Sequence, residues 1–116
     1  MITIRQEEDY TVLKLQATSW NNHIFEILYN EVITLDTVPM IIDASKFTEI
    51  GEIEGLLQGL STIGEEHIIV MVVGHKLYED YNIFADFTLP ITPTFREAED
   101  MLFMVKMERE LGLDEI

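Results

Sequence analysis

Short apolar runs alternate along this chain with segments whose apolar residues recur at helical spacing, and this alternation limits the folds open to it. The runs Pro39–Ala44 and His67–Val73 suit strands that are buried on both faces. Tyr10–Leu15 alternates like a strand with one wet face, and Ile2–Ile4 can pair with it across the polar turn QEED. Thr88–Ile91 is a further brief strand. These five segments are the predicted strands.

Four helices are predicted between and after these strands. Their spans are Trp20–Leu35, Glu52–Ile63, Lys76–Phe84 and Thr94–Leu111. Ser19 is the expected cap of the first helix, and Gly64 ends the second. Thr94 and Glu97 form a T-x-x-E capping box at the start of the last helix, and Gly112 is its stop. The third helix has the weakest pattern.

The resulting order is β-β-α-β-α-β-α-β-α. Strands that alternate with helices favour a mainly parallel sheet with right-handed crossovers, so the predicted class is α/β. The chain has 116 residues, 47% of them hydrophobic, which is enough for a buried core. No linker, low-complexity tract or internal repeat interrupts it. We therefore expect a single domain over residues 1–116.

Charge and composition exclude several classes of partner. The chain carries 22 acidic against 7 basic side chains, a formal net charge of −15. A field of that sign repels phosphate backbones and anionic lipid headgroups, so neither nucleic acid nor a membrane surface is expected as partner. Scattered acids favour a role in solubility, and a basic protein partner is the alternative. The absence of cysteine excludes disulfides and thiolate metal sites.

The amino-terminal segment and the apolar runs bear on localisation. The start MITIRQEEDY has acids where a secretory signal needs a basic region followed by an apolar one. The longest aliphatic run, Ile68–Val73, is too short to cross a bilayer. A cytoplasmic protein without a membrane span is the prediction.

A search for catalytic patterns finds none. His23, His67 and His75 lie in no recognisable nucleophile or base context, and structural roles are expected for them. His75 and Glu79 stand four residues apart, but no second ligand pair accompanies them. The glycines match no phosphate-binding pattern. We predict no enzymatic activity, no metal and no cofactor.

The second predicted helix carries a stripe of glycines. Gly51, Gly55 and Gly59 recur every fourth residue, opposite the apolar positions, which predicts that they point away from the core. Glycine inside a helix costs about 1 kcal/mol relative to alanine, so the stripe needs a reason. A surface that a partner's backbone can approach closely is one explanation, and a locally mobile helix start is the other.

Two further features suggest binding surfaces. Asp43 ends a buried strand at its carboxyl edge, where open α/β sheets place ligands, although capping of the turn after it is the preferred role. The last helix has apolar side chains beyond one core stripe, since Phe103, Met104 and Met107 lie off the stripe that includes Leu102. This excess predicts a second contact there, such as a homodimer.

The element order and several local strings together resemble the STAS family, the SpoIIAA-like domains of sulfate transporters and anti-sigma factor antagonists. The stretch MIIDASKFTEIGEIEGLLQGL is similar to the family's strand, loop and Gly-Leu helix, with Asp43, Gly55 and Leu56 in matching places. Phe95 and Ala98 are similar to its closing helix. The resemblance implies a STAS-like fold with a mostly parallel sheet and a non-enzymatic regulatory role.

The chain departs from that family at the phosphorylation site. Antagonist members carry a phosphorylated serine at the start of the helix, where this chain has Gly51, Glu52 and Ile53. Ser45 and Thr48, just upstream, are the nearest hydroxyls. A SpoIIAA-like branch related to lipid-binding domains shares the architecture without that serine.

Three functions follow from these observations; the last of them is an enzyme subunit whose active residues need another chain. The first is a module that binds a protein partner, basic in charge or not, through the turn after Asp43 and the second helix. Its predicted contact residues are Asp43, Ser45, Thr48, Glu52, Gly55 and Gly59. The second is a binder of a small apolar ligand, such as a lipid or acyl chain, in a cavity between helices and sheet.

Overall fold

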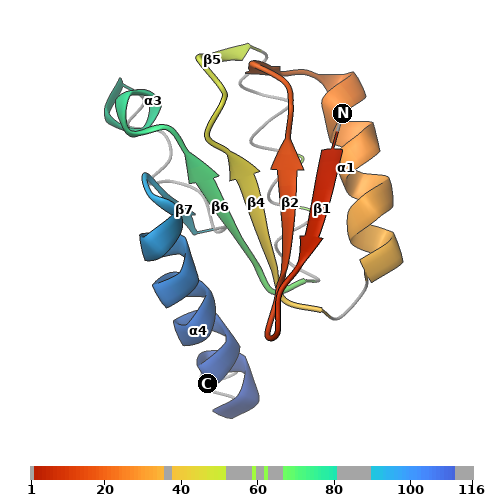
Figure 1. The fold of residues 1–116 in the computed structure, drawn as a ribbon, viewed down its shortest axis with the longest axis vertical. Helices are drawn as coiled ribbons and strands as arrows, with labels where there is room; N and C mark the ends of the chain where they lie inside the picture. Colours follow the sequence, from red (N-terminus) through yellow and green to blue (C-terminus); the bar gives the residue numbers. More distant parts are fainter. Residues whose placement is uncertain are drawn as a thin grey trace.

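The chain folds around a mixed five-stranded sheet of order β1-β2-β4-β6-β7 (Figure 1). The computed structural model describes residues 2–35, 38–51, 59, 62, 67–80 and 90–111. β1 pairs antiparallel with β2, and the other three pairings are parallel. The strands are β1 Ile2–Gln6, β2 Thr11–Leu15, β4 Met40–Ala44, β6 Ile69–Val73 and β7 Ile91–Thr92. The predicted α/β class is confirmed.

The two most apolar runs occupy the middle of the sheet, as their composition predicts. Every side chain of β6 is buried, and β4 is buried except at Asp43. Strands that are covered on both faces need apolar side chains on both, which is why these runs do not alternate. β7 ends one residue later than the predicted brief strand and does not include Pro90, and residues 88–89 of that prediction lie outside the described residues.

Three helices are described, α1 Asn22–Leu35, α3 His75–Asp80 and α4 Phe95–Leu111. Ser19 was the expected cap of α1, and this prediction is wrong: Asn21 accepts the Ile24 backbone N–H at 3.0 Å through Oδ1. The capping residue of α4 is confirmed, because Thr94 Oγ1 accepts the Glu97 N–H at 3.1 Å. Residues 81–84 of the third predicted helix lie outside the described residues.

A second, two-stranded sheet was not predicted. β3 (Ser19–Trp20) pairs in parallel with β5 (Glu49–Gly51). Ser19 and Trp20 therefore belong to a strand rather than to the cap and first turn of a helix. The pair ties the segment before α1 to the segment after β4, and Figure 1 shows β5 beyond the arrowheads of β2 and β4.

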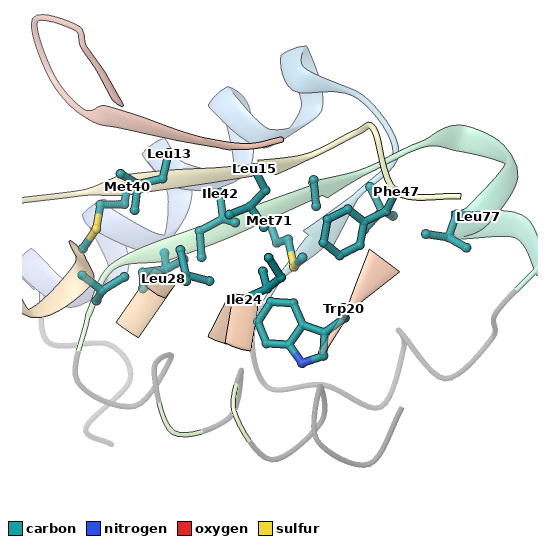
Figure 2. Packing of buried hydrophobic residues seen from close by; sticks show 14 residues of the cluster. Leu13, Leu15, Trp20, Ile24, Leu28, Met40, Ile42, Phe47, Met71 and Leu77 are labelled. Carbon is teal, nitrogen blue, oxygen red and sulfur yellow. The ribbon is translucent and has the colours of Figure 1, made fainter. Parts of the chain in front are cut away.

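The face of the sheet that α1 covers holds the larger buried cluster. Leu13, Ile42 and Met71 from neighbouring strands pack with Ile24 and Leu28 of α1 (Figure 2). Burial of each large aliphatic side chain stabilises the fold by about 1.5–3 kcal/mol in transfer free energy. This cluster is therefore the main source of stability for the described part of the chain.

Helix α4 covers the opposite face. Ile41, Val70 and Val72 alternate with the residues of the first cluster along their strands and pack against Ala98 and Leu102. α4 makes its principal contacts with β4, β6 and β7. The apolar stripe predicted for this helix is confirmed at Ala98 and Leu102, which are both buried.

Gly59, a described residue of the second predicted helix, contradicts the predicted glycine orientation. Gly59 is helical and buried, and a Cβ placed on it would lie 2.7 Å from two ring carbons of Phe25 on α1. The glycine stripe was expected to point away from the core because the apolar positions of the second predicted helix lie on its opposite side. Instead, the ring of Phe25 takes up the space beside Gly59, and a side chain larger than hydrogen has no room there. Gly55 lies outside the described residues.

Candidate functional site

The turn after β4 is organised by Asp43. Its Oδ1 accepts the Ser45 backbone N–H at 3.0 Å, and Phe47 N–H donates to the carbonyl of Ala44 at 3.1 Å. The first bond is the short side-chain-to-backbone bond that stabilises such turns. The capping role predicted for Asp43 is therefore confirmed, and the bonded carboxylate holds the chain reversal that exposes Ser45.

The segment that follows is anchored at both ends. The Phe47 side chain is buried at 4% exposure in the cluster beneath α1. The backbone N–H of Thr48 donates to the carbonyl of Thr18 at 2.8 Å, directly before the β3–β5 pairing begins. Ser45 and Thr48 are thus exposed residues on a segment that backbone bonds and a buried ring hold in place, and the Thr48 hydroxyl donates to the Thr18 carbonyl at 3.5 Å.

A hollow of about 440 Å³ lies beside this segment, at the carboxyl ends of β4 and β6. Its lining residues are Ser45, Phe47, Thr48, Gly74, His75, Lys76 and Leu77. The two loops approach closely, since a Cβ on Gly74 would lie 3.4 Å from the Ser45 carbonyl oxygen. Figure 1 shows β5 and α3 on either side of these strand ends. We call this surface the carboxyl-edge hollow.

The structure gathers part of the predicted contact set at this edge. Ser45 and Thr48 line the hollow, and Asp43 holds the turn that forms its wall. Gly59 is buried against Phe25 of α1, so its prediction as an exposed contact residue is wrong. Glu52 and Gly55 lie outside the described residues.

The hollow also includes residues that the sequence did not single out as binding residues. Gly74, Lys76 and Leu77 come from the end of β6 and the first turn of α3. The sequence does contain a signal for these residues. The carboxyl ends of adjacent parallel strands lie at one edge of a sheet, so the residues that follow β6 must lie beside those that follow β4. The pairing of β4 with β6 supplies that adjacency.

His75 and Glu79 pair with each other at the rim of this hollow. His75 Nε2 lies 2.8 Å from Glu79 Oε1, and both side chains are largely exposed. Such a pair at i,i+4 contributes little to stability in water. Among the described residues, no group of three histidines and carboxylates is arranged to hold a metal ion.

A second hollow, of about 280 Å³, lies on the other side of the sheet beside α4. It is lined by Asp9, Tyr10, Pro39, Glu99, Leu102, Phe103 and Lys106. The Tyr10 hydroxyl donates to Glu99 Oε2 at 2.8 Å. Burial raises the pKa of Tyr10 to about 12, and the hydrogen bond to Glu99 and the negative charge of Glu99 contribute to the same shift. The phenol stays protonated there and joins the β1–β2 turn to α4.

No model of a known protein family matches the chain, and a search of curated proteins finds no significant match. No helix of the described residues is long and apolar enough to span a membrane.

Proposed function

We propose that this chain is a non-enzymatic, STAS-like interaction module that binds a protein partner at the carboxyl-edge hollow. The observation that carries the proposal is the anchored segment Ser45–Thr48 beside a hollow of about 440 Å³. A segment that is already ordered loses little conformational entropy when a partner docks, so more of the contact energy appears as affinity. The STAS resemblance supports a binding role, without the phosphoserine of the antagonist members.

The chemistry of the hollow fits a polar protein segment. Ser45 offers a hydroxyl that both donates and accepts, the Thr48 hydroxyl, which donates to Thr18, can still accept, and Lys76 offers a cation. Phe47 and Leu77 form apolar parts of the wall while their side chains remain in the core. A loop or strand end with an acceptor for Lys76 would find complementary groups here.

The proposal is tested by capture of partners from a lysate of the native cell with matched variants. Thr48→Trp fills the hollow, and Lys76→Glu reverses its cation. Both side chains are exposed, so both variants should keep the wild-type melting temperature. Each should weaken the affinity for the captured partner about tenfold or more, which corresponds to a loss of about 1.4 kcal/mol or more.

Ile33→Ser supplies the control, because Ile33 is exposed on α1, and the hollow is lined by no residue of that helix. This variant should capture the partner as the wild type does. If Thr48→Trp and Lys76→Glu retain every protein that Ile33→Ser retains, the carboxyl-edge hollow is not the binding surface.

One observation favours the alternative, a module that binds an apolar ligand between helices and sheet. Trp20 is 1% exposed, and its indole Nε1–H has no hydrogen-bond partner among the described residues. A buried donor without a partner costs about 1–3 kcal/mol, and the carboxylate of an acyl ligand would relieve that cost. Trp20 is the only tryptophan, so its fluorescence reports this site directly. Oleate should shift that emission if the alternative is right, and it should leave it unchanged if the hollow is the functional site.

A further inference from the structure

The outer side of α4 carries a strip of exposed apolar side chains. Phe103, Met104 and Met107 are 65%, 54% and 43% exposed, although each is a large hydrophobic residue. Met107 follows Phe103 by four residues and Met104 by three, so the three side chains lie on one side of the helix. Flexible methionine side chains can adapt to the shape of a partner's surface, so a strip of methionine and phenylalanine suits contact with another protein. We call these residues the α4 strip.

The α4 strip continues into the second hollow. Phe103 belongs to both, and its neighbours Leu102, Tyr10 and Pro39 supply apolar walls. The carboxylates of Asp9 and Glu99 line the same hollow, and the Tyr10 hydroxyl donates a hydrogen bond to one oxygen of Glu99. A volume of about 280 Å³ with apolar walls and acidic groups suits a long aliphatic stem that ends in a cation.

Charges around the α4 strip are mainly acidic. Asp100 precedes Phe103 by three residues and Glu110 follows Met107 by three, so both extend the strip's side of the helix. Arg96 also lies on this side, and Lys106 lines the hollow. The net charge of −15 adds a long-range field that attracts basic molecules.

We propose that the α4 strip and the adjoining hollow bind a basic amphipathic helix of a protein partner. The apolar side of that helix covers Phe103, Met104 and Met107, and one lysine or arginine enters the hollow toward Asp9 and Glu99. The mode is a helix laid against an apolar surface, with charge complementarity setting its orientation. This inference concerns a different face from the carboxyl-edge hollow and does not depend on the function proposed there.

The negative charge of the chain favours a basic helix over a second copy of the chain as the occupant of this surface. Two copies that each carry −15 repel each other, and the acids beside the α4 strip would face acids on the partner copy. A basic helix gains attraction from the same groups. The homodimer predicted from the sequence therefore becomes the competing outcome of the test.

The test uses the synthetic peptide LKKLLKLLKKLLKL, whose leucines fall on one side of a helix. Fluorescence anisotropy of the labelled peptide is followed while the full chain is added. Wild type should bind it, with an affinity that falls as salt is raised. Phe103→Ser combined with Met107→Ser should weaken binding about tenfold or more, because these are the central apolar contacts. Ile33→Ser removes an equally exposed apolar residue on α1 and should change nothing.

A second pair of variants separates specific from general charge attraction. Glu99→Gln and Glu26→Gln alter the net charge equally, but only Glu99 lines the hollow, whereas Glu26 is exposed on α1. Glu99→Gln should weaken binding about fivefold, and Glu26→Gln by less than about twofold. Equal effects of the two, or equal binding by all variants, would show general attraction and overturn the proposal. So would a wild-type dimer in sedimentation that Phe103→Ser with Met107→Ser converts to a monomer.

Discussion

Gly59 lies against the ring of Phe25, and a methyl group at Gly59 would come within 2.7 Å of Cδ2 and Cε2. The ring cannot move freely, because it is flanked by Trp20 and Tyr29 at centroid distances of 5.9 and 5.7 Å. The hydrogen side chain of Gly59 is therefore a packing requirement between the second predicted helix and α1.

Gly59→Ala should consequently destabilise the chain. Overpacking costs about 1–3 kcal/mol, and the better helix propensity of alanine returns up to about 1 kcal/mol. The expected net loss is about 1 kcal/mol, measured by denaturant unfolding. In a Phe25→Leu background the loss should shrink, since the smaller side chain leaves room for the methyl group. An increase in stability in the wild-type background would mean that Gly59 faces outward after all.

Thr94 caps the helix that carries the α4 strip. Its hydroxyl accepts the Glu97 N–H at 3.1 Å. Thr94→Ala should lower the free energy of unfolding by about 1 kcal/mol, because one amide at the helix start loses its acceptor. Thr94→Ser keeps the hydroxyl and should retain most of the stability. Equal losses in the two variants would point to the threonine methyl group rather than to the cap.

Tyr10 makes the stability depend on pH in the alkaline range. Its folded-state pKa of about 12 exceeds the ordinary value of 10.0, so the neutral phenol is favoured by folding. The stability contributed is complete below about pH 10 and is lost as the pH rises toward about 12. The tyrosinate absorbance that Tyr10→Phe removes should titrate at about 12.

Glu99→Gln tests how much Glu99 contributes to the raised pKa of Tyr10. The amide oxygen still accepts the Tyr10 hydroxyl, but the charge that opposes a tyrosinate is gone. The pKa of Tyr10 should fall, yet stay above its ordinary value because burial, the largest cause of the shift, remains. An unchanged titration would show that Glu99 does not control Tyr10.

Asp43 should matter for both the turn and binding. Asp43→Ala removes the acceptor for the Ser45 N–H and should cost about 1 kcal/mol in unfolding free energy. Asp43→Asn retains an acceptor oxygen and should behave nearly as the wild type. If Asp43→Ala leaves both stability and partner capture unchanged, the bonded turn is not what holds the carboxyl-edge hollow in shape.

The strands and helices with strong patterns could be predicted from the sequence. β6 is apolar along its whole length and β4 is apolar except at Asp43, which fits strands covered by helices on both faces. The cap of α4 at Thr94 also agrees with the prediction, since capping chemistry is local. The turn at Asp43 is local too and was predicted correctly.

The remaining features depend on contacts that are distant in sequence. β3 and β5 have two and three residues, too few to show any period, and their pairing joins segments about thirty residues apart. The environment of Gly59 depends on Phe25, which no pattern in the second predicted helix reveals. The carboxyl-edge hollow required the pairing of β4 with β6 before Lys76 could be placed beside Ser45.

Site-specific photo-crosslinking in the native cell shows whether the carboxyl-edge hollow binds a protein partner. A photoreactive amino acid replaces Thr48 or Lys76, which line the hollow, or Glu26, which is exposed on α1. We expect one shared protein adduct at Thr48 and Lys76 that is absent at Glu26. Adducts of the same proteins in similar amounts at all three positions, or no adduct at Thr48 and Lys76, would contradict it.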